Sequence, residues 1–63
     1  MADFIEEEDT QNCRNMIDEL LDVTSGLYAN EIDFLENIKN EWEGNLTTSQ
    51  AAWIEKIYKR IFS

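Results

Sequence analysis

The chain contains no proline and only two glycines, Gly26 and Gly44, and each glycine stands where a helical pattern stops. Glycine is favoured just past the C-terminal end of a helix because it adopts positive φ at no steric cost. The two glycines therefore divide the 63 residues into three segments. Each segment carries apolar residues at three- and four-residue spacing, which predicts an all-α protein folded as a compact three-helix bundle.

The first helix is expected over about residues 9–24. Its apolar stripe consists of Cys13, Met16, Ile17, Leu20 and Leu21. Cys13 lies within this stripe, so it is interpreted as a small core residue and not as a reactive thiol. Phe4 and Ile5 precede a run of acids, and three placements stay open for them. They pack back on the bundle, extend the helix, or belong to a flexible acidic arm formed by residues 1–8.

The second helix is expected over about residues 30–43. Asn30 is a favourable N-cap, and Asp33 follows it at the spacing of a capping box. The apolar face of this helix consists of Ile32, Leu35, Ile38 and Trp42. Gly44 is expected to close the helix.

The third helix is expected over about residues 47–62, and it has the clearest start. Thr47 and Gln50 have the spacing of a capping box. Near the other end lie three cations that complement the helix dipole: Lys56, Lys59 and Arg60. The short break at Gly44 and Asn45 predicts that the last two helices form an antiparallel hairpin.

A chain of 63 residues is expected to form a single domain over residues 1–63, and so small a core makes its stability marginal. Cys13 has no cysteine partner for a disulfide, and without histidine a structural zinc site is not expected. Self-association as a homodimer is one remaining source of stability. The single cysteine and the start MADFIEEEDT, which lacks a signal-peptide pattern, predict a cytoplasmic protein. No window approaches the roughly 20 apolar residues of a membrane span, so a membrane partner is not expected.

The residue types argue against an enzyme and against a cofactor. There is no histidine to act as a base or as a metal ligand. Asp18 and Asp22 share a helix face and could bridge a divalent ion weakly, but they are interpreted as solvated acids because no calcium-loop pattern accompanies them. The prediction is a binding protein without catalytic, metal or cofactor sites.

Charge is distributed unevenly along the chain. The formal net charge is −9, from fourteen acids and five bases; residues 1–35 hold ten acids and one base, Arg14, and residues 36–63 hold four of each. Nucleic acids and anionic membranes require lysine and arginine, so a basic protein surface suits this charge better. Two interpretations stay open: an ordinary surface that keeps the protein soluble, or a charge-guided partner site. The aromatic residues are numerous for this length, which predicts that some of them lie at an interface.

The second half resembles a known sequence pattern. The stretch FLENIKNEWEGNLTTSQAAWIEKIYKRIF, residues 34–62, resembles a short helical hairpin that recurs in small bacteriophage and mobile-element proteins. The residues that carry this resemblance are Leu46, Thr47, Gln50, Trp53, Ile54, Ile57 and Tyr58, followed by Lys59 and Arg60. In size and charge the chain is also similar to the small acidic proteins that phages use against host defences, among them anti-CRISPR proteins, several of which mimic DNA. This second resemblance implies a class of function and no particular residue.

The leading hypothesis is a small acidic phage-type protein that binds and inhibits a basic, nucleic-acid-handling host protein such as a CRISPR effector. Its predicted partner-binding residues are Glu6, Glu7, Glu8, Asp9, Asp18, Glu19 and Asp22, with Trp42, Trp53 and Tyr58 as aromatic anchors. The alternative is a homo-oligomeric structural or accessory phage protein with a dimer seam formed by Trp42, Trp53, Tyr58 and Phe62. Direct nucleic-acid binding through Lys56, Lys59 and Arg60 ranks third, because three cations must act against a net charge of −9.

Overall fold

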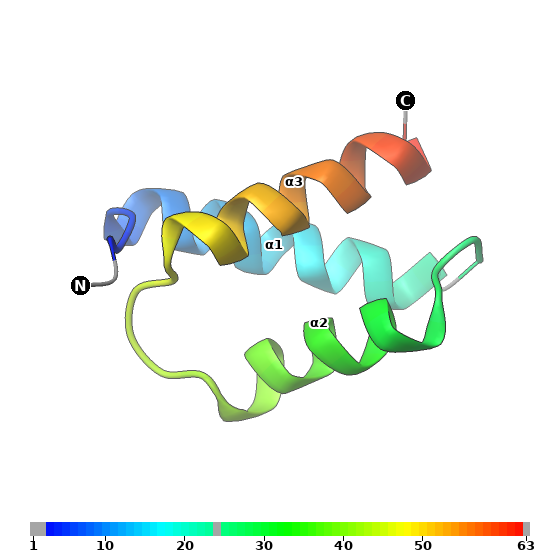
Figure 1. The fold of residues 1–63 in the computed structure, drawn as a ribbon, viewed down its shortest axis with the longest axis horizontal. Helices are drawn as coiled ribbons and strands as arrows, with labels where there is room; N and C mark the ends of the chain where they lie inside the picture. The colour runs from blue at the N-terminus through cyan, green and yellow to red at the C-terminus, as the bar shows by residue number, and fades with distance from the viewer. Residues whose placement is uncertain (1–2, 24, 63) are drawn as a thin grey trace.

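In the part of the chain that the structure describes there are three α-helices: α1 (Glu7–Val23), α2 (Ala29–Glu41) and α3 (Thr48–Phe62). The computed structural model describes residues 3–23 and 25–62. In Figure 1, α1 and α3 run in the same direction and α2 runs back against them, and α1 packs against both other helices. The predicted all-α three-helix bundle is confirmed.

The start of α1 lies two residues earlier than expected, at Glu7, so the acids form its first turn instead of preceding it. Negative side chains are favourable there because the first backbone N–H groups of a helix are unpaired and carry partial positive charge. The helix is described to Val23, and Thr24, the expected last residue, lies outside the described residues. Gly26, at φ 84°, then turns the chain toward α2.

The start of α2 corrects the sequence expectation of an N-cap at Asn30. The helix begins at Ala29, and its N-cap is Tyr28. The backbone N–H of Tyr28 donates to the Glu31 carboxylate at 3.0 Å. Glu31 thus closes the first turn two positions earlier than Asp33 would have done with a cap at Asn30.

The end of α2 also differs from the expectation. The helix stops at Glu41, because Trp42 is extended with φ −83° and ψ 128°, so Gly44 lies within the connection and not at the helix end. The connection comprises residues 42–47 and is longer than the expected two-residue break. α2 and α3 do run antiparallel, but both pack more closely on α1 than on each other.

The start of α3 agrees with the prediction. The backbone N–H of Thr47 donates to Gln50 Oε1 at 2.9 Å, and the backbone N–H of Gln50 donates to Thr47 Oγ1 at 3.2 Å. This reciprocal pair is a complete capping box. Because both partners lie within one turn, the sequence alone was sufficient to find it.

The segment before α1 is tied to the connection between α2 and α3. Phe4 and Thr47 form an antiparallel β-bridge, in which the N–H of Ile5 donates to Leu46 O at 2.8 Å and the N–H of Thr48 donates to Asp3 O at 2.9 Å. The Ile5 side chain packs against the core, whereas Phe4 is 59% exposed. Of the placements left open, the structure shows packing back on the bundle; Met1 and Ala2 of the proposed arm lie outside the described residues.

The core is formed by apolar side chains from all three helices and from the connection after α2. It consists of Cys13, Ile17, Leu20, Leu35, Ile38, Leu46, Ile54 and Ile57. Cys13 is 4% exposed, as its position in the apolar stripe predicts. Among the described residues, two polar side chains are also buried, and each has a defined partner. Thr10 Oγ1 accepts a hydrogen bond from the N–H of Leu46 at 3.1 Å, and Glu31 pairs with Arg60.

Candidate interaction surface

The basic residue of α1, Arg14, is directed inward, toward the end of α2. Its guanidinium donates to Trp42 O at 2.9 Å, and to Ile38 O and Gly44 O at 3.4 Å each. Carbonyls at a helix C-terminus lack helical partners and carry partial negative charge, so a guanidinium is a suitable cap there. Arg14 therefore joins α1 to α2, and among the described residues it forms no ion pair with an acid of α1.

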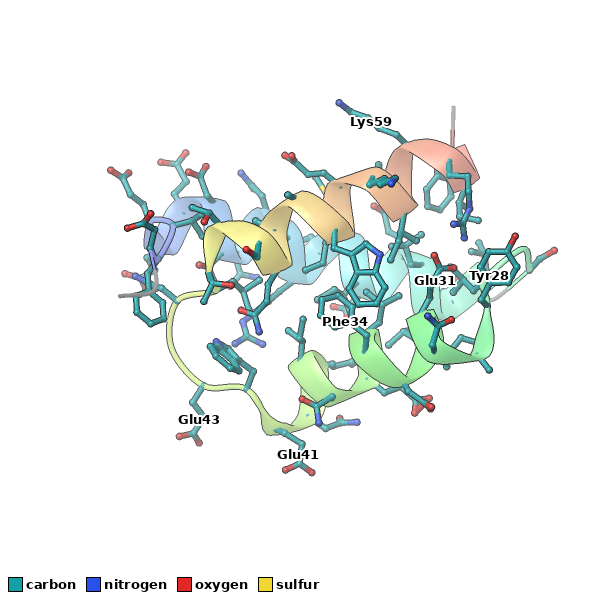
Figure 2. The ribbon with its side chains drawn as sticks, in the orientation of Figure 1. Tyr28, Glu31, Phe34, Glu41, Glu43 and Lys59 are labelled. Carbon is teal, nitrogen blue, oxygen red and sulfur yellow. The ribbon has the colours of Figure 1, made fainter. Side chains whose placement is uncertain are left out.

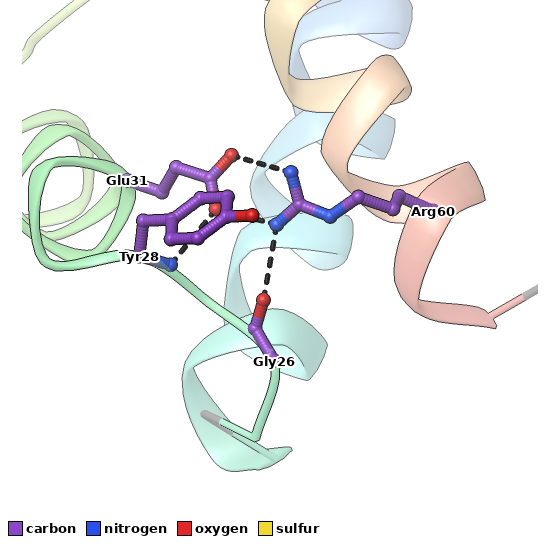
Figure 3. Close-up of polar contacts among 4 residues, drawn as sticks. All are labelled: Gly26, Tyr28, Glu31 and Arg60. Carbon is purple, nitrogen blue, oxygen red and sulfur yellow. Dashed lines mark hydrogen bonds and ion pairs between the residues drawn. The ribbon is translucent and has the colours of Figure 1, made fainter.

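A second arginine, Arg60, forms several polar contacts at the other end of the bundle. Figure 3 shows these contacts. Its Nη1 and Nη2 donate to Glu31 Oε2 and Oε1 at 2.8 and 2.5 Å, and Nη2 also donates to Gly26 O at 3.1 Å. The guanidinium lies over the Tyr28 ring, with Arg60 Cζ 5.1 Å from the ring centroid. The hydrogen bonds from Arg60 hold the pKa of Glu31 below its ordinary value, although burial of the carboxyl acts in the opposite direction.

The lysines divide between α2 and α3. Lys39 of α2 pairs with Asp18 of α1 at 3.1 Å, with both side chains largely exposed. Lys56 and Lys59 are exposed on α3, and Figure 2 shows Lys59 projecting away from α2. Arg60, the third member of the predicted nucleic-acid contact, is committed to Glu31 and Gly26.

The seven predicted acidic contact residues are all exposed, but they form two groups at opposite ends of α1. One group is Glu6, Glu7, Glu8 and Asp9, and the other is Asp18, Glu19 and Asp22. Between them the outer side of α1 carries the uncharged polar residues Gln11, Asn12 and Asn15. The interval from Asp9 to Asp18 corresponds to about 14 Å of helix.

Two members of the second group have intramolecular partners. Asp18 pairs with Lys39, and Glu19 accepts a hydrogen bond from Tyr58 Oη at 2.8 Å. This hydrogen bond to Glu19 raises the pKa of Tyr58, as do burial and the negative charge of the carboxylate. Within the described part of the chain, Asp22 has no ion-pair partner.

The structure adds acids that the sequence interpretation had left out. The outer side of α2 forms a shallow, polar hollow of about 250 Å³ lined by Asp33, Glu36, Asn37, Asn40 and Glu41. In Figure 2, Glu41 and Glu43 project outward at the end of α2. Of these acids, Asp33 alone lies within residues 1–35, where the sequence analysis located the net negative charge, and none was among the predicted contact residues. The three- and four-residue spacing of Asp33, Glu36 and Asn40 was the available signal.

The predicted aromatic anchors are mostly parts of the fold. Trp42, Trp53 and Tyr58 are half-buried and pack against the core. Figure 2 shows Phe34 directed into the space between α2 and α3. There the centroids of the Phe34 and Trp53 rings lie 4.0 Å apart. Trp42 Nε1 donates to Asn45 O at 3.2 Å.

The exposed aromatic residues lie elsewhere. Phe4 is 59%, Tyr28 is 66% and Phe62 is 46% exposed. The Phe62 ring stacks at a tilt against Tyr58, 4.7 Å between centroids. In Figure 1, α2 and α3 end at opposite ends of the bundle, so a dimer seam formed by Trp42, Trp53, Tyr58 and Phe62 would have to extend along much of its length.

In residues 3–23 and 25–62, no group of three or more histidine, cysteine, aspartate or glutamate side chains is arranged to hold a metal ion. Over the same residues, no helix has the length and apolar content needed to cross a bilayer.

Comparison with known proteins adds no relative: no family model, no curated protein and no solved structure matches the chain significantly. The resemblance of residues 34–62 to a phage hairpin therefore stays a prediction.

Proposed function

We propose that the protein binds the nucleic-acid groove of a basic protein through the outer side of α1, and thereby inhibits that protein. The supporting observation is that the guanidinium of Arg14, the basic residue of α1, donates to backbone carbonyls near the end of α2 and forms no ion pair with an acid of α1 among the described residues. A CRISPR effector or another nucleic-acid-handling host protein has a groove of the required chemistry, since such grooves are lined by lysine and arginine.

The position of the second acidic group supports a functional role because it is unfavourable for folding. Asp18, Glu19 and Asp22 lie in the last turns of α1, where the helix dipole favours cations, and the last turn contains no basic residue. Lys39 and Tyr58 offset this for Asp18 and Glu19, but no described side chain does so for Asp22. A small domain that retains such a charge gives up stability, which a partner with lysine and arginine would restore.

The dimensions of α1 fit this mechanism. Its 17 residues extend about 25 Å, which is comparable to about seven base pairs of duplex DNA. Carboxylates on a rigid helix occupy sites that otherwise bind phosphates, and the overall negative charge accelerates encounter with a basic surface. The partner's groove would thus be filled in competition with nucleic acid.

The test begins with capture from nuclease-treated bacterial lysate on the immobilised protein, followed by mass spectrometry of the bound fraction. Each captured protein is then purified, and its binding to labelled DNA is measured by fluorescence anisotropy with increasing amounts of this protein. We expect displacement of the DNA, weakening as salt is raised. Displacement by a variant in which Glu7, Glu8 and Asp22 are changed to Gln, Gln and Asn should be at least tenfold weaker.

The matched control neutralises three acids of α2, with Asp33, Glu36 and Glu41 changed to Asn, Gln and Gln. It makes the same change in net charge on a different surface, so it should retain most of the inhibition. Equal losses in both variants would show nonspecific attraction and would reject the α1 surface. Capture of only further copies of this chain would instead favour the homo-oligomeric accessory protein.

A further inference from the structure

A groove lies between α1 and α3, and one member of the first acidic group, Asp9, contributes to its lining. It has a volume of about 380 Å³, within the range of small ligand sites. The wall from α3 is built from small side chains, Ala51, Ala52 and Thr48, which leave the space open. The wall from α1 contains Asp9, Asn12, Cys13 and Met16. Ile5 of the N-terminal segment and Glu55 of α3 complete the lining.

The apolar lining and the charged lining occupy different depths. Cys13 is buried, and Ile5, Met16 and Ala51 are partly buried against the core, so the floor is apolar. Asp9 and Glu55 are exposed and come from opposite walls. Both carboxylates raise the pKa of the Cys13 thiol, in addition to the larger effect of burial, which agrees with their facing the same floor.

The lining contains no basic side chain, and neither Asp9 nor Glu55 has an ion-pair partner within the described residues. An anionic ligand would be repelled, and a purely apolar one would bury the carboxylates without a hydrogen-bond donor. A long aliphatic chain that ends in a cation satisfies both parts of the groove. Arginine fits best, because its planar guanidinium presents several donors and can bind two carboxylates at once.

We infer that this groove accepts an arginine side chain of a basic partner, with the aliphatic stem over Cys13 and Met16 and the guanidinium between Asp9 and Glu55. The inference rests on the proposed binding of a basic protein and adds a specific pocket to it. The α1 surface supplies long-range attraction, and the groove supplies a desolvated anchor near that surface. The sequence had predicted such an anchor at Trp42, Trp53 and Tyr58, which pack against the core in the structure.

The test uses a defined probe, the peptide acetyl-Gly-Arg-Gly-amide, titrated into the ¹⁵N-labelled full chain. We expect millimolar binding with chemical-shift changes concentrated at the amides of Cys13, Met16, Ala51 and Ala52. The same peptide with citrulline in place of arginine is the neutral isostere and should bind roughly tenfold more weakly. Alkylation of Cys13 by iodoacetamide should slow as the arginine peptide is added.

The variant Asp9→Asn with Glu55→Gln should lose most of the arginine preference, whereas Asp33→Asn with Glu36→Gln makes the same charge change on α2 and should keep it. Equal binding of the two peptides, or an unchanged arginine preference in the groove variant, would overturn the inference. These peptide measurements do not test DNA displacement, which is measured separately with the variant changed at Glu7, Glu8 and Asp22. Conversely, a chain that binds the arginine peptide in the groove but displaces no DNA would reject the proposed function alone.

Discussion

The Glu31 carboxylate in the first turn of α2 and the Arg60 guanidinium in the last turn of α3 form a two-point ion pair across 29 positions of the chain. Each charge also has the sign that its own helix end favours. Arg60 extends the contact to Gly26 O, so that one side chain joins α3 to α2 and to the turn after α1. The pair organises the end of the bundle at which α1 and α3 terminate.

This pair predicts a specific pH dependence for Glu31→Gln. The pKa of Glu31 is lower in the folded than in the unfolded chain. The stabilisation that ionised Glu31 gives the folded chain is therefore complete above its ordinary pKa of 4.5 and is lost as the pH falls through its pKa in the folded chain. The wild type should therefore exceed the variant in free energy of unfolding by a constant amount above about pH 5, and this difference should shrink at lower pH. Urea titrations between pH 3 and 7 measure it, and a difference that stays constant down to pH 3 would contradict the prediction.

Replacement of Arg14 by methionine should destabilise the protein. The change keeps much of the aliphatic stem but removes the donors to the carbonyls at the end of α2. We expect a loss of about 1.5–3 kcal/mol in the free energy of unfolding, the usual contribution of hydrogen bonds to a charged group. Arg14→Lys keeps the charge with fewer donors and should lie between the two. A loss below about 0.5 kcal/mol by urea denaturation would show that the cap is unimportant.

Replacement of Thr10 by valine tests a buried hydrogen bond between α1 and the connection after α2. The shape is nearly unchanged, but the N–H of Leu46 loses its acceptor at a buried position. The expected cost is about 1–3 kcal/mol, and hydrogen exchange at Leu46 should accelerate. Thr10→Ser retains the oxygen and should cost only about 1 kcal/mol for the lost methyl group. If serine were as damaging as valine, packing and not the hydrogen bond would account for the effect.

The two glycines should respond differently to alanine. Both have positive φ, 84° at Gly26 and 82° at Gly44, which costs an alanine about 1–2 kcal/mol. A Cβ at Gly26 would also lie 3.1 Å from Ile61 Cδ1, whereas at Gly44 it would meet no atom within 4 Å. Gly26→Ala should therefore lower the melting temperature more than Gly44→Ala. Equal shifts would mean that Ile61 moves aside without cost.

Neutralising acids at the two ends of α1 should have opposite effects on stability. Asp22→Asn removes a charge that opposes the helix dipole and should add a few tenths to about 1 kcal/mol, whereas Glu8→Gln removes a favourable charge and should subtract a similar amount. Both effects should diminish in 1 M salt. Thermal melts at low and high salt provide the measurement. Stabilisation by both changes would show that overall repulsion, and not the dipole, governs these positions.

Features that depend on residues close together in the chain could be predicted from the sequence alone. The periodic apolar positions and the two glycines predicted three helices, because burial of a stripe and a positive φ are local requirements. The Thr47–Gln50 capping box was found for the same reason. The burial of Cys13 followed from its place in the α1 stripe.

Which polar and aromatic groups remain available to a partner depends on contacts that form only when the chain folds. Composition treats Arg14 as a cation among acids, but the carbonyls that it caps belong to residues 24–30 positions away. Glu31 pairs with Arg60 and accepts a hydrogen bond from the N–H of Tyr28, so the N-cap of α2 is Tyr28. Trp42 and Trp53 pack against the core, whereas Tyr28 and Phe62 stay exposed. Side-chain direction at such positions depends on partners brought together by folding, and no local pattern contains that information.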